Sequence, residues 1–236
     1  MSDHHKYEAI AIDGPAASGK STVARRLAKE LGLIMVNSGE MYRAVTLAVV
    51  QEEVDPSDPA AVVKLLQEID LHCAVKEGHS VVLLDGTHPG EALRCDAVNA
   101  AVSQVATVPE VRDVLVAAQR ELLKLGDLVM EGRDIGSVVF PDTPFKFYIE
   151  ASEEVRNQRR RAEGQVDELS SRDRQDAERK TSPPVVAERA QVIDSSALSI
   201  SEVVDAALDV LRTRGWFERM IASATHCTRS TVAPAP

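Results

Sequence analysis

Short apolar runs along the chain alternate with segments that carry apolar residues at helical spacing. Between two of these runs, Val23, Leu27 and Leu31 recur on one helical face, and Gly32 is suited to end that helix. Strands that alternate with helices are typical of a parallel sheet covered on both faces. The pattern predicts a three-layer α/β/α fold with a five-stranded parallel sheet as its core. The five runs read as strands are residues 9–12, 33–36, 128–130, 145–149 and 192–193.

Two stretches interrupt this alternation. In residues 55–120, apolar segments at 71–75 and 81–84 flank a polar turn, and helical patterns follow at 97–106 and 111–123. We interpret this stretch as a small insert that contains β-structure. Residues 153–180 balance basic against acidic side chains, which favours a mobile helical flap.

Composition narrows the class of protein. The formal net charge of −10 opposes a broad grip on nucleic acid or on an anionic membrane, because phosphate-rich partners are held by basic surfaces. The longest apolar run, residues 44–50, is far shorter than the roughly 20 residues that span a bilayer, and residues 1–6 lack the apolar centre of a signal peptide. Cys73, Cys95 and Cys227 show no metal-ligand or redox spacing. We expect a cytoplasmic protein with free thiols.

A phosphate-binding motif lies between the first predicted strand and the first helix. The segment from Gly14 to Ser21 matches G-x-x-x-x-G-K-[ST], the P-loop, in the structural context that the motif requires. Its backbone N–H groups curl around phosphates, Lys20 reaches the β and γ phosphates, and Ser21 binds Mg²⁺. The sequence therefore predicts a site for Mg-ATP. We expect the motif and the next residue to form it: Gly14, Pro15, Ala16, Ala17, Ser18, Gly19, Lys20, Ser21 and Thr22.

Further polar clusters follow later strands. Ser38 and Arg43 come after the second strand, and Arg133 and Asp134 after the third, so all four should meet the P-loop at the carboxyl edge of the sheet. In the flap, one helical face carries the set Arg172, Asp176 and Arg179. Several guanidinium groups beside a triphosphate site indicate a second substrate that bears a phosphate.

These motifs together resemble those of the cytidylate kinase family over about residues 10–208. The resemblance lies in Ile12-Asp13-Gly14-Pro15 before the P-loop, in Asn37-Ser38-Gly39 with Tyr42-Arg43, in Ser103-Gln104-Val105-Ala106, and in Glu131-Gly132-Arg133-Asp134. The segments Arg172 to Arg179 and Ile193-Asp194-Ser195 also resemble the family pattern. The family implies an adenylate-kinase-like P-loop NTPase fold with an NMP-binding insert and a short helical lid.

The resemblance also implies an activity and residue roles. The activity is transfer of the ATP γ-phosphoryl group to CMP and dCMP with Mg²⁺. Arg43, Arg133 and Arg179 would hold the CMP phosphate, Ser103, Arg112 and Asp134 would read the cytosine, and Arg172 and Asp176 would meet the sugar. Ser38 would also bind CMP, and Arg160 would contact ATP, although Arg156 and Arg159 are alternatives. The residues expected to take part in catalysis are Lys20, Arg133, Arg172 and Arg179.

The family pattern also predicts domain boundaries and differs from this chain in three places. We expect a core of residues 7–55, 121–154 and 180–220, an insert of residues 56–120, a lid of residues 155–179 and a flexible tail of residues 221–236. Asn37 and Glu131 stand where the family commonly has Asp, and the segment between Arg161 and Arg172 is short for the lid. Glu131 could reach Mg²⁺ through water. We expect a monomer.

Two other functions remain open from the sequence. A P-loop kinase could act on another acceptor, such as UMP or AMP. A protein of a different class, such as a GTPase-like switch, could use the same P-loop, but the chain lacks the Asn-Lys-x-Asp element that selects guanine.

Overall fold

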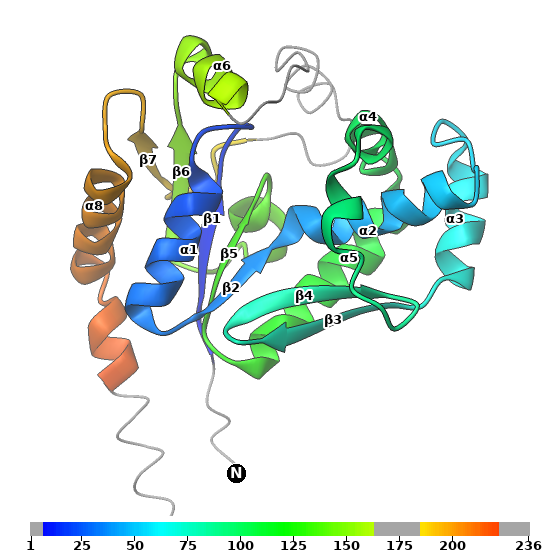
Figure 1. The fold of residues 1–236 in the computed structure, drawn as a ribbon. Coiled ribbons are helices and arrows are strands. Elements are labelled where there is room, and N and C mark those ends of the chain that lie inside the picture. The colour runs from blue at the N-terminus through cyan, green and yellow to red at the C-terminus, as the bar shows by residue number, and fades with distance from the viewer. Residues whose placement is uncertain (1–6, 163–184, 222–236) are drawn as a thin grey trace, which may run out of the picture.

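The fold is built around one mixed sheet (Figure 1). The computed structural model describes residues 7–162 and 185–221. Within those ranges the sheet has seven strands in the order β3-β4-β2-β5-β1-β6-β7. Five consecutive strands in this order, β2, β5, β1, β6 and β7, all run parallel, which confirms the predicted parallel core. Their bounds are β1 Ala9–Asp13, β2 Ile34–Asn37, β5 Leu128–Gly132, β6 Lys146–Glu150 and β7 Gln191–Asp194.

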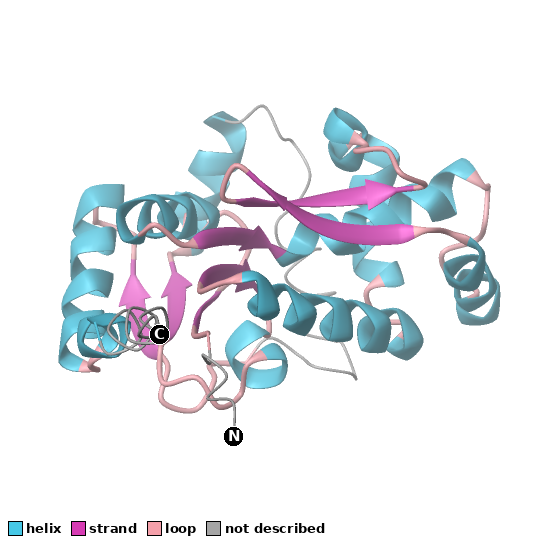
Figure 2. Ribbon diagram, turned by 90° about the horizontal axis from the view of Figure 1, so that it is seen from below, coloured by secondary structure: helices cyan, strands magenta, loops and turns pink. Residues whose placement is uncertain are grey.

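Helices cover both faces of this sheet (Figure 2). On one face, α1 (Lys20–Leu31) and α8 (Ile200–Thr213) pack Leu27 and Val203 against strand residues such as Ile10. On the other face, α5 (Pro109–Leu122) and η3 (Ile135–Val139) pack against the opposite sides of the same strands, around Met130. The result is the three-layer α/β/α arrangement that the periodicity predicted.

Local sequence determines where α1 begins and ends. Gly19 precedes the helix in a left-handed conformation with φ of 88°, and Gly32 follows it with φ of 67°. Both conformations favour glycine because a Cβ strains a left-handed backbone. The N–H of Gly32 donates to the carbonyl of Ala28, which satisfies an otherwise free carbonyl in the last turn. The helix therefore runs over the range expected from its apolar face.

The segment between β2 and β5 builds a second apolar core. It comprises α2 (Ser38–Gln51), α3 (Pro59–Glu68), η1 (Gly90–Arg94), α4 (Asp96–Val105) and the hairpin of β3 (Leu71–Lys76) and β4 (His79–Leu84). The hairpin is antiparallel, and β4 joins the main sheet beside β2 through the pair Met35 and His79. The β-structure expected in the insert therefore extends the central sheet.

Helix α5 belongs to both cores. Its residues Val111 and Leu115 pack in the second core with α2 and α4, whereas Val116 and Leu122 pack against the central sheet. The short helix η2 (Leu123–Leu125) then leads into β5. One continuous helix thus joins the insert to the sheet.

Two further helices follow β6 and α8. Helix α6 (Glu153–Ala162) follows β6 and begins the segment expected to be a helical lid. After α8, a helix at residues 216–221 places Trp216 edge-on against Phe145, with ring centroids 4.8 Å apart. Across residues 7–162 and 185–221, none of the helices has the length and apolar character needed to cross a membrane.

Candidate active site

The candidate site lies where three adjacent strands end. The strand register pairs Asn37 with Glu131 and Asp13 with Gly132, so the segments after β2, β5 and β1 leave the sheet at one edge. A cavity of about 260 Å³ opens there. Its wall includes twelve residues that the sequence nominated, which are Ala16, Ala17, Lys20, Ser21, Ser38, Arg43, Ser103, Arg112, Glu131, Arg133, Asp134 and Arg160.

The P-loop turns sharply at its first glycine. A Cβ built on Gly14 would lie 2.1 Å from the carbonyl oxygen of Ile149 in β6, so a larger residue cannot fit there without moving the strand. The rest of the loop separates into two groups. Ala16, Ala17, Lys20 and Ser21 line the cavity, whereas Thr22 is exposed on α1 and is not part of the wall. The hydroxyl of Ser18 is buried and has no hydrogen-bond partner among the described residues.

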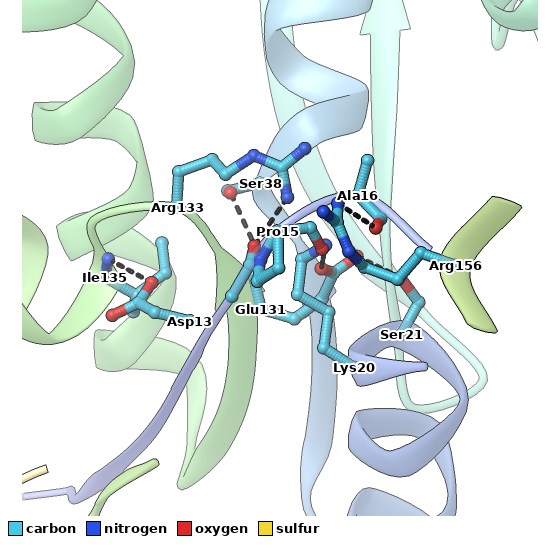
Figure 3. Close-up of polar contacts among 11 residues, drawn as sticks. Asp13, Pro15, Ala16, Lys20, Ser21, Ser38, Glu131, Arg133, Ile135 and Arg156 are labelled. Atoms are coloured by element: carbon cyan, nitrogen blue, oxygen red, sulfur yellow. Dashed lines mark hydrogen bonds and ion pairs between the residues drawn. The ribbon is translucent and has the colours of Figure 1, made fainter. Parts of the chain in front are cut away.

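Lys20, Ser21 and Glu131 converge at the floor of the site (Figure 3). The Lys20 ammonium donates to the Pro15 carbonyl at 3.0 Å and lies 3.9 Å from Oε2 of Glu131. The Ser21 hydroxyl donates to Oε1 of the same carboxylate at 2.8 Å. Glu131 is only 4% exposed, so its charge is poorly solvated and depends on these neighbours. A serine hydroxyl and a carboxylate side by side are oxygen groups that Mg²⁺ accepts.

Arg133 connects the two halves of the site. Its Nη1 donates to the carbonyl of Gly14 at 2.6 Å, which brings the end of β5 against the start of the P-loop. Beside it, the Ser38 hydroxyl donates to the backbone carbonyl of Glu131 at 2.9 Å. The arginine predicted to hold an acceptor phosphate is therefore adjacent to the loop predicted to hold ATP.

A buried ion pair forms one wall of the cavity. Nη2 of Arg112, from α5, donates to Oδ2 of Asp134, and both side chains are almost fully buried. The Arg112 guanidinium also lies over the ring of Tyr42, 5.8 Å from its centroid. Ser103 of α4 lines the same cavity. The three residues expected to read a base are thus brought together.

Arg43 holds the rim of the cavity in place. Its Nη1 donates to the Leu93 carbonyl and to Oδ1 of Asn99, each at 2.8 Å. The Asn99 amide in turn donates to the Arg94 carbonyl. These bonds fix η1 against α2 and present the Arg94 side chain to the cavity, where it pairs with Glu40 at 3.3 Å.

Sequence reasoning missed Arg94. It lies in residues 85–95, which have neither helical nor strand periodicity, and its side chain is largely exposed. The sequence holds no local signal that distinguishes it from a solvated arginine. Its place in the site depends on the contacts of Arg43 and Asn99 with η1.

The arginines of α6 have different surroundings. Arg156 and Arg159 donate to the P-loop carbonyls of Ala16 and Ala17 at 3.4 and 3.3 Å, and Arg159 also bonds Ser195 after β7. Arg160 instead is buried and lines the cavity. The predicted lid residues Arg172, Asp176 and Arg179 lie outside the described residues.

Asp13 is the buried carboxylate at the end of β1. It accepts hydrogen bonds from the backbone N–H groups of Ile135 and Gly136. Burial raises its pKa to about 6, with a smaller contribution from the negative charge of Asp134, and the two backbone donors only partly oppose the rise. In the sequence, only its place in the family pattern distinguishes Asp13.

Comparison with known proteins identifies relatives along nearly the whole chain. The pattern of the family described as cytidylate kinase matches residues 10–213. A cytidylate kinase from Pelotomaculum thermopropionicum is 43% identical over 212 residues, which are 85% of this chain and 94% of that protein. One from Caldanaerobacter subterraneus is 41% identical over 214 residues, or 86% and 94%. Among solved structures, a gluconokinase from Sinorhizobium meliloti is 16% identical, covers 90% of this chain and 98% of its own, and has a TM-score of 0.48.

Proposed function

The chain belongs to the cytidylate kinase family, and we propose that it transfers the γ-phosphoryl group of ATP to CMP and dCMP, forming ADP and CDP or dCDP. The observation that carries this proposal is the 2.6 Å contact between Arg133 and the Gly14 carbonyl. It joins a P-loop to a cavity lined by buried polar groups, so two phosphate-bearing substrates can meet end to end.

The donor half of the reaction is assigned to the P-loop. Its backbone N–H groups and Lys20 bind the phosphates of ATP and neutralise charge as the γ-phosphoryl group leaves. Mg²⁺ bound with ATP would shield the same phosphate oxygens, and Ser21 and Glu131 are the residues that would hold it, directly or through water. In the described ranges no group of three His, Cys, Asp or Glu side chains could hold a metal ion alone, so the phosphates of ATP would complete such a site.

The acceptor half needs no general base. A phosphate oxygen of CMP is already an anion and attacks the γ-phosphorus, and the bond from that phosphorus to the oxygen bridging to the β-phosphate breaks, which releases ADP. Arg43 and Arg133 line the acceptor cavity and are assigned to the CMP phosphate. Arg172, Asp176 and Arg179 are assigned to the phosphate and the sugar from their sequence positions alone.

Base selection is assigned to Ser103, Arg112 and Asp134. Cytosine offers an amino group that needs an acceptor, which Asp134 provides, and a ring carbonyl that needs a donor, which Arg112 provides. The Arg112–Asp134 ion pair supports this assignment because it holds both groups in fixed orientation before a base arrives. A base of the wrong polarity would leave buried groups unpaired, so UMP is expected to be the poorer substrate.

We also propose the domain roles and the state of the protein. Residues 56–120 form the CMP-binding insert and residues 155–179 the lid, on a core of residues 7–55, 121–154 and 180–220 with a tail of residues 221–236. In this division α2 belongs to the core, and the second apolar core, in which α4 and α5 pack with α2, supports an insert that is held against that helix. The protein is a cytoplasmic monomer that does not bind nucleic acid. Light scattering on a gel-filtration column tests the monomer, and retention on DNA at low salt tests the last statement.

The direct test is steady-state ADP formation from Mg-ATP with CMP, dCMP, UMP, AMP and GMP offered separately, beside ATP alone. We expect CMP and dCMP to give the highest kcat/KM. A preference for another monophosphate would retain a kinase but discard the base-reading roles. Hydrolysis that no acceptor stimulates would favour a switch protein.

A further inference from the structure

Both oxygens of the Asp13 carboxylate accept hydrogen bonds from backbone N–H groups of another loop. Oδ1 accepts from the N–H of Ile135 at 2.7 Å, and Oδ2 accepts from the N–H of Gly136 at 2.8 Å. Figure 3 shows Asp13 on β1 pointing to the loop after β5, away from the P-loop that follows it in sequence. The side chain is 3% exposed, so these bonds form where water cannot replace them.

Those two donors begin η3, the element that follows Arg133 and Asp134. Immediately upstream, Arg133 donates back to the Gly14 carbonyl. Two consecutive residues, 13 and 14, therefore contact three residues of the segment 133–136, namely Arg133, Ile135 and Gly136. One set of contacts comes from a carboxylate to backbone N–H groups, and the other from a guanidinium to a backbone carbonyl.

We propose that Asp13 is a positioning residue that sets the acceptor-binding residues Arg133 and Asp134 relative to the P-loop. Asp13 touches neither substrate. It acts by fixing the backbone on which both side chains are carried. This inference rests on the proposed function, since it names what aligns the two substrates of that reaction.

The opposite end of η3 is also held by a charged side chain. Arg120 of α5 donates its Nε to the Val139 carbonyl at 2.9 Å and its Nη2 to the Val138 carbonyl at 2.7 Å. Asp13 thus binds the first N–H groups of η3, and Arg120 binds its last carbonyls. Because α5 also carries Arg112, both partners of the Arg112–Asp134 pair depend on how η3 is anchored.

The positioning role of Asp13 depends on its hydrogen bonds more than on the charges around it. Asp134 opposes its negative charge, and Lys20 favours it. Lys146 of β6 directs its ammonium to the carbonyls of Pro141 and Glu188, and Arg133 directs Nη1 to the Gly14 carbonyl. The two backbone N–H groups are consequently the specific contacts that an amide at position 13 would disturb, because its NH₂ group would face one of them.

The P-loop itself has other supports. Asp13 pairs with Gly132 on one side and with Tyr148 on the other through the sheet, and Gly14 packs directly on the Ile149 carbonyl. Loss of the carboxylate should therefore displace the loop of Arg133 and Asp134 more than it displaces the P-loop. The expected signature is a larger effect on the KM for CMP than on the KM for ATP.

The test compares Asp13→Asn with the wild type in steady-state assays that vary CMP and ATP independently. We expect the KM for CMP to rise about tenfold or more, since a buried donor loses its acceptor, while the KM for ATP changes by less than about threefold. Asp205→Asn, a carboxylate exposed on α8, is the control and should change neither constant. Parallel changes in both KM values, or no change in either, would overturn the proposal.

A second variant keeps the charge and perturbs the same joint. A Cβ on Gly136 would lie 3.3 Å from Oδ2 of Asp13 and 3.2 Å from Cδ of Lys146, so Gly136→Ala crowds the bond without removing it. This variant should also raise the KM for CMP selectively, and it decides the question if Asp13→Asn does not fold. If the wild type prefers another monophosphate, the proposed function fails, and the same comparison on that acceptor still judges the role of Asp13.

Discussion

The hydroxyl of Ser21 donates a 2.8 Å hydrogen bond to Oε1 of Glu131, which links the first turn of α1 to the end of β5. The glutamate side chain is one methylene longer than an aspartate at this position would be. Its extra length lets the carboxylate meet the Ser21 hydroxyl directly and lie 3.9 Å from the Lys20 ammonium. The three groups that we propose to bind Mg-ATP therefore lie next to one another.

Replacing Glu131 should change the requirement for Mg²⁺. Glu131→Gln keeps the size of the side chain but removes its charge, so the Mg²⁺ concentration for half-maximal rate should rise by about fivefold or more. A titration of rate against Mg²⁺ at fixed ATP measures this. Glu218→Gln, which alters an exposed carboxylate, should leave the titration unchanged. An unaltered Mg²⁺ requirement in Glu131→Gln would remove Glu131 from the metal site.

Lys20→Ala should lose turnover and keep the fold. The ammonium is expected to neutralise charge on the transferring phosphoryl group, and groups in this role contribute on the order of 100-fold or more to kcat. Lys29→Ala, an exposed lysine near the end of the same helix, should retain the wild-type kcat. Circular dichroism of both variants checks that α1 remains intact. Turnover of Lys20→Ala close to the wild type would contradict the site.

Asp134→Asn should weaken the preference for cytosine. The amide keeps the shape and one acceptor but adds a donor, so kcat/KM for CMP should fall about 10-fold to 100-fold while that for UMP falls less. Assays of both monophosphates give the ratio directly. Asp142→Asn, at an exposed position beyond η3, is the matched control. A CMP to UMP ratio equal to that of the wild type would show that Asp134 does not read the base.

Arg133→Ala should separate acceptor binding from folding. The side chain is assigned to the CMP phosphate, so kcat/KM for CMP should fall on the order of 100-fold, while the thermal midpoint changes by only a few degrees because the residue is partly exposed. Arg26→Ala, an exposed arginine of α1, serves as the control. A normal kcat/KM in Arg133→Ala would withdraw the assignment that carries the proposed function.

The raised pKa of Asp13 predicts a pH dependence of stability. Asp13 has a pKa of about 6 in the folded protein, whereas the ordinary pKa of an aspartate, which applies to the unfolded chain, is 3.8. Protonation of Asp13 therefore contributes fully to the free energy of unfolding below about pH 4. This contribution, roughly 3 kcal/mol, is lost as the pH rises through 6. Urea unfolding at pH 4.5 and 7.5 measures it. The pH-dependent change should be smaller in Asp13→Asn, and identical changes in both proteins would contradict the assignment.

The sequence predicts the position of the site better than its internal contacts. Ser38, Arg133 and the P-loop could be placed together because parallel strands end at one edge, and the register of Asn37 with Glu131 fulfils that expectation. The P-loop needs only local signals, namely glycines and an amphipathic helix. The five parallel strands were likewise foreseen from the alternation of apolar runs and helices.

The missed features depend on contacts between distant segments. Arg94 is placed by Arg43, 51 residues earlier, through the Leu93 carbonyl and Asn99. The π-helix η3 follows a polar turn and has no period that marks it in sequence, and its first N–H groups are bound by Asp13 from another strand. The union of the β3–β4 hairpin with the sheet rests on the pair Met35 and His79, which no local pattern indicates.

The packing of α5 in two cores restricts how the acceptor cavity could narrow around a nucleotide. Rotation of the insert as a rigid body would have to shear either the contacts of Leu115 with the insert or those of Val116 with the sheet, because tightly packed interiors resist gradual deformation. Arg112 would travel with the helix, whereas Asp134 follows β5. Any closure driven by a substrate would therefore first change the geometry of this ion pair. Movement of the insert would then be coupled directly to the two groups that we propose select the base.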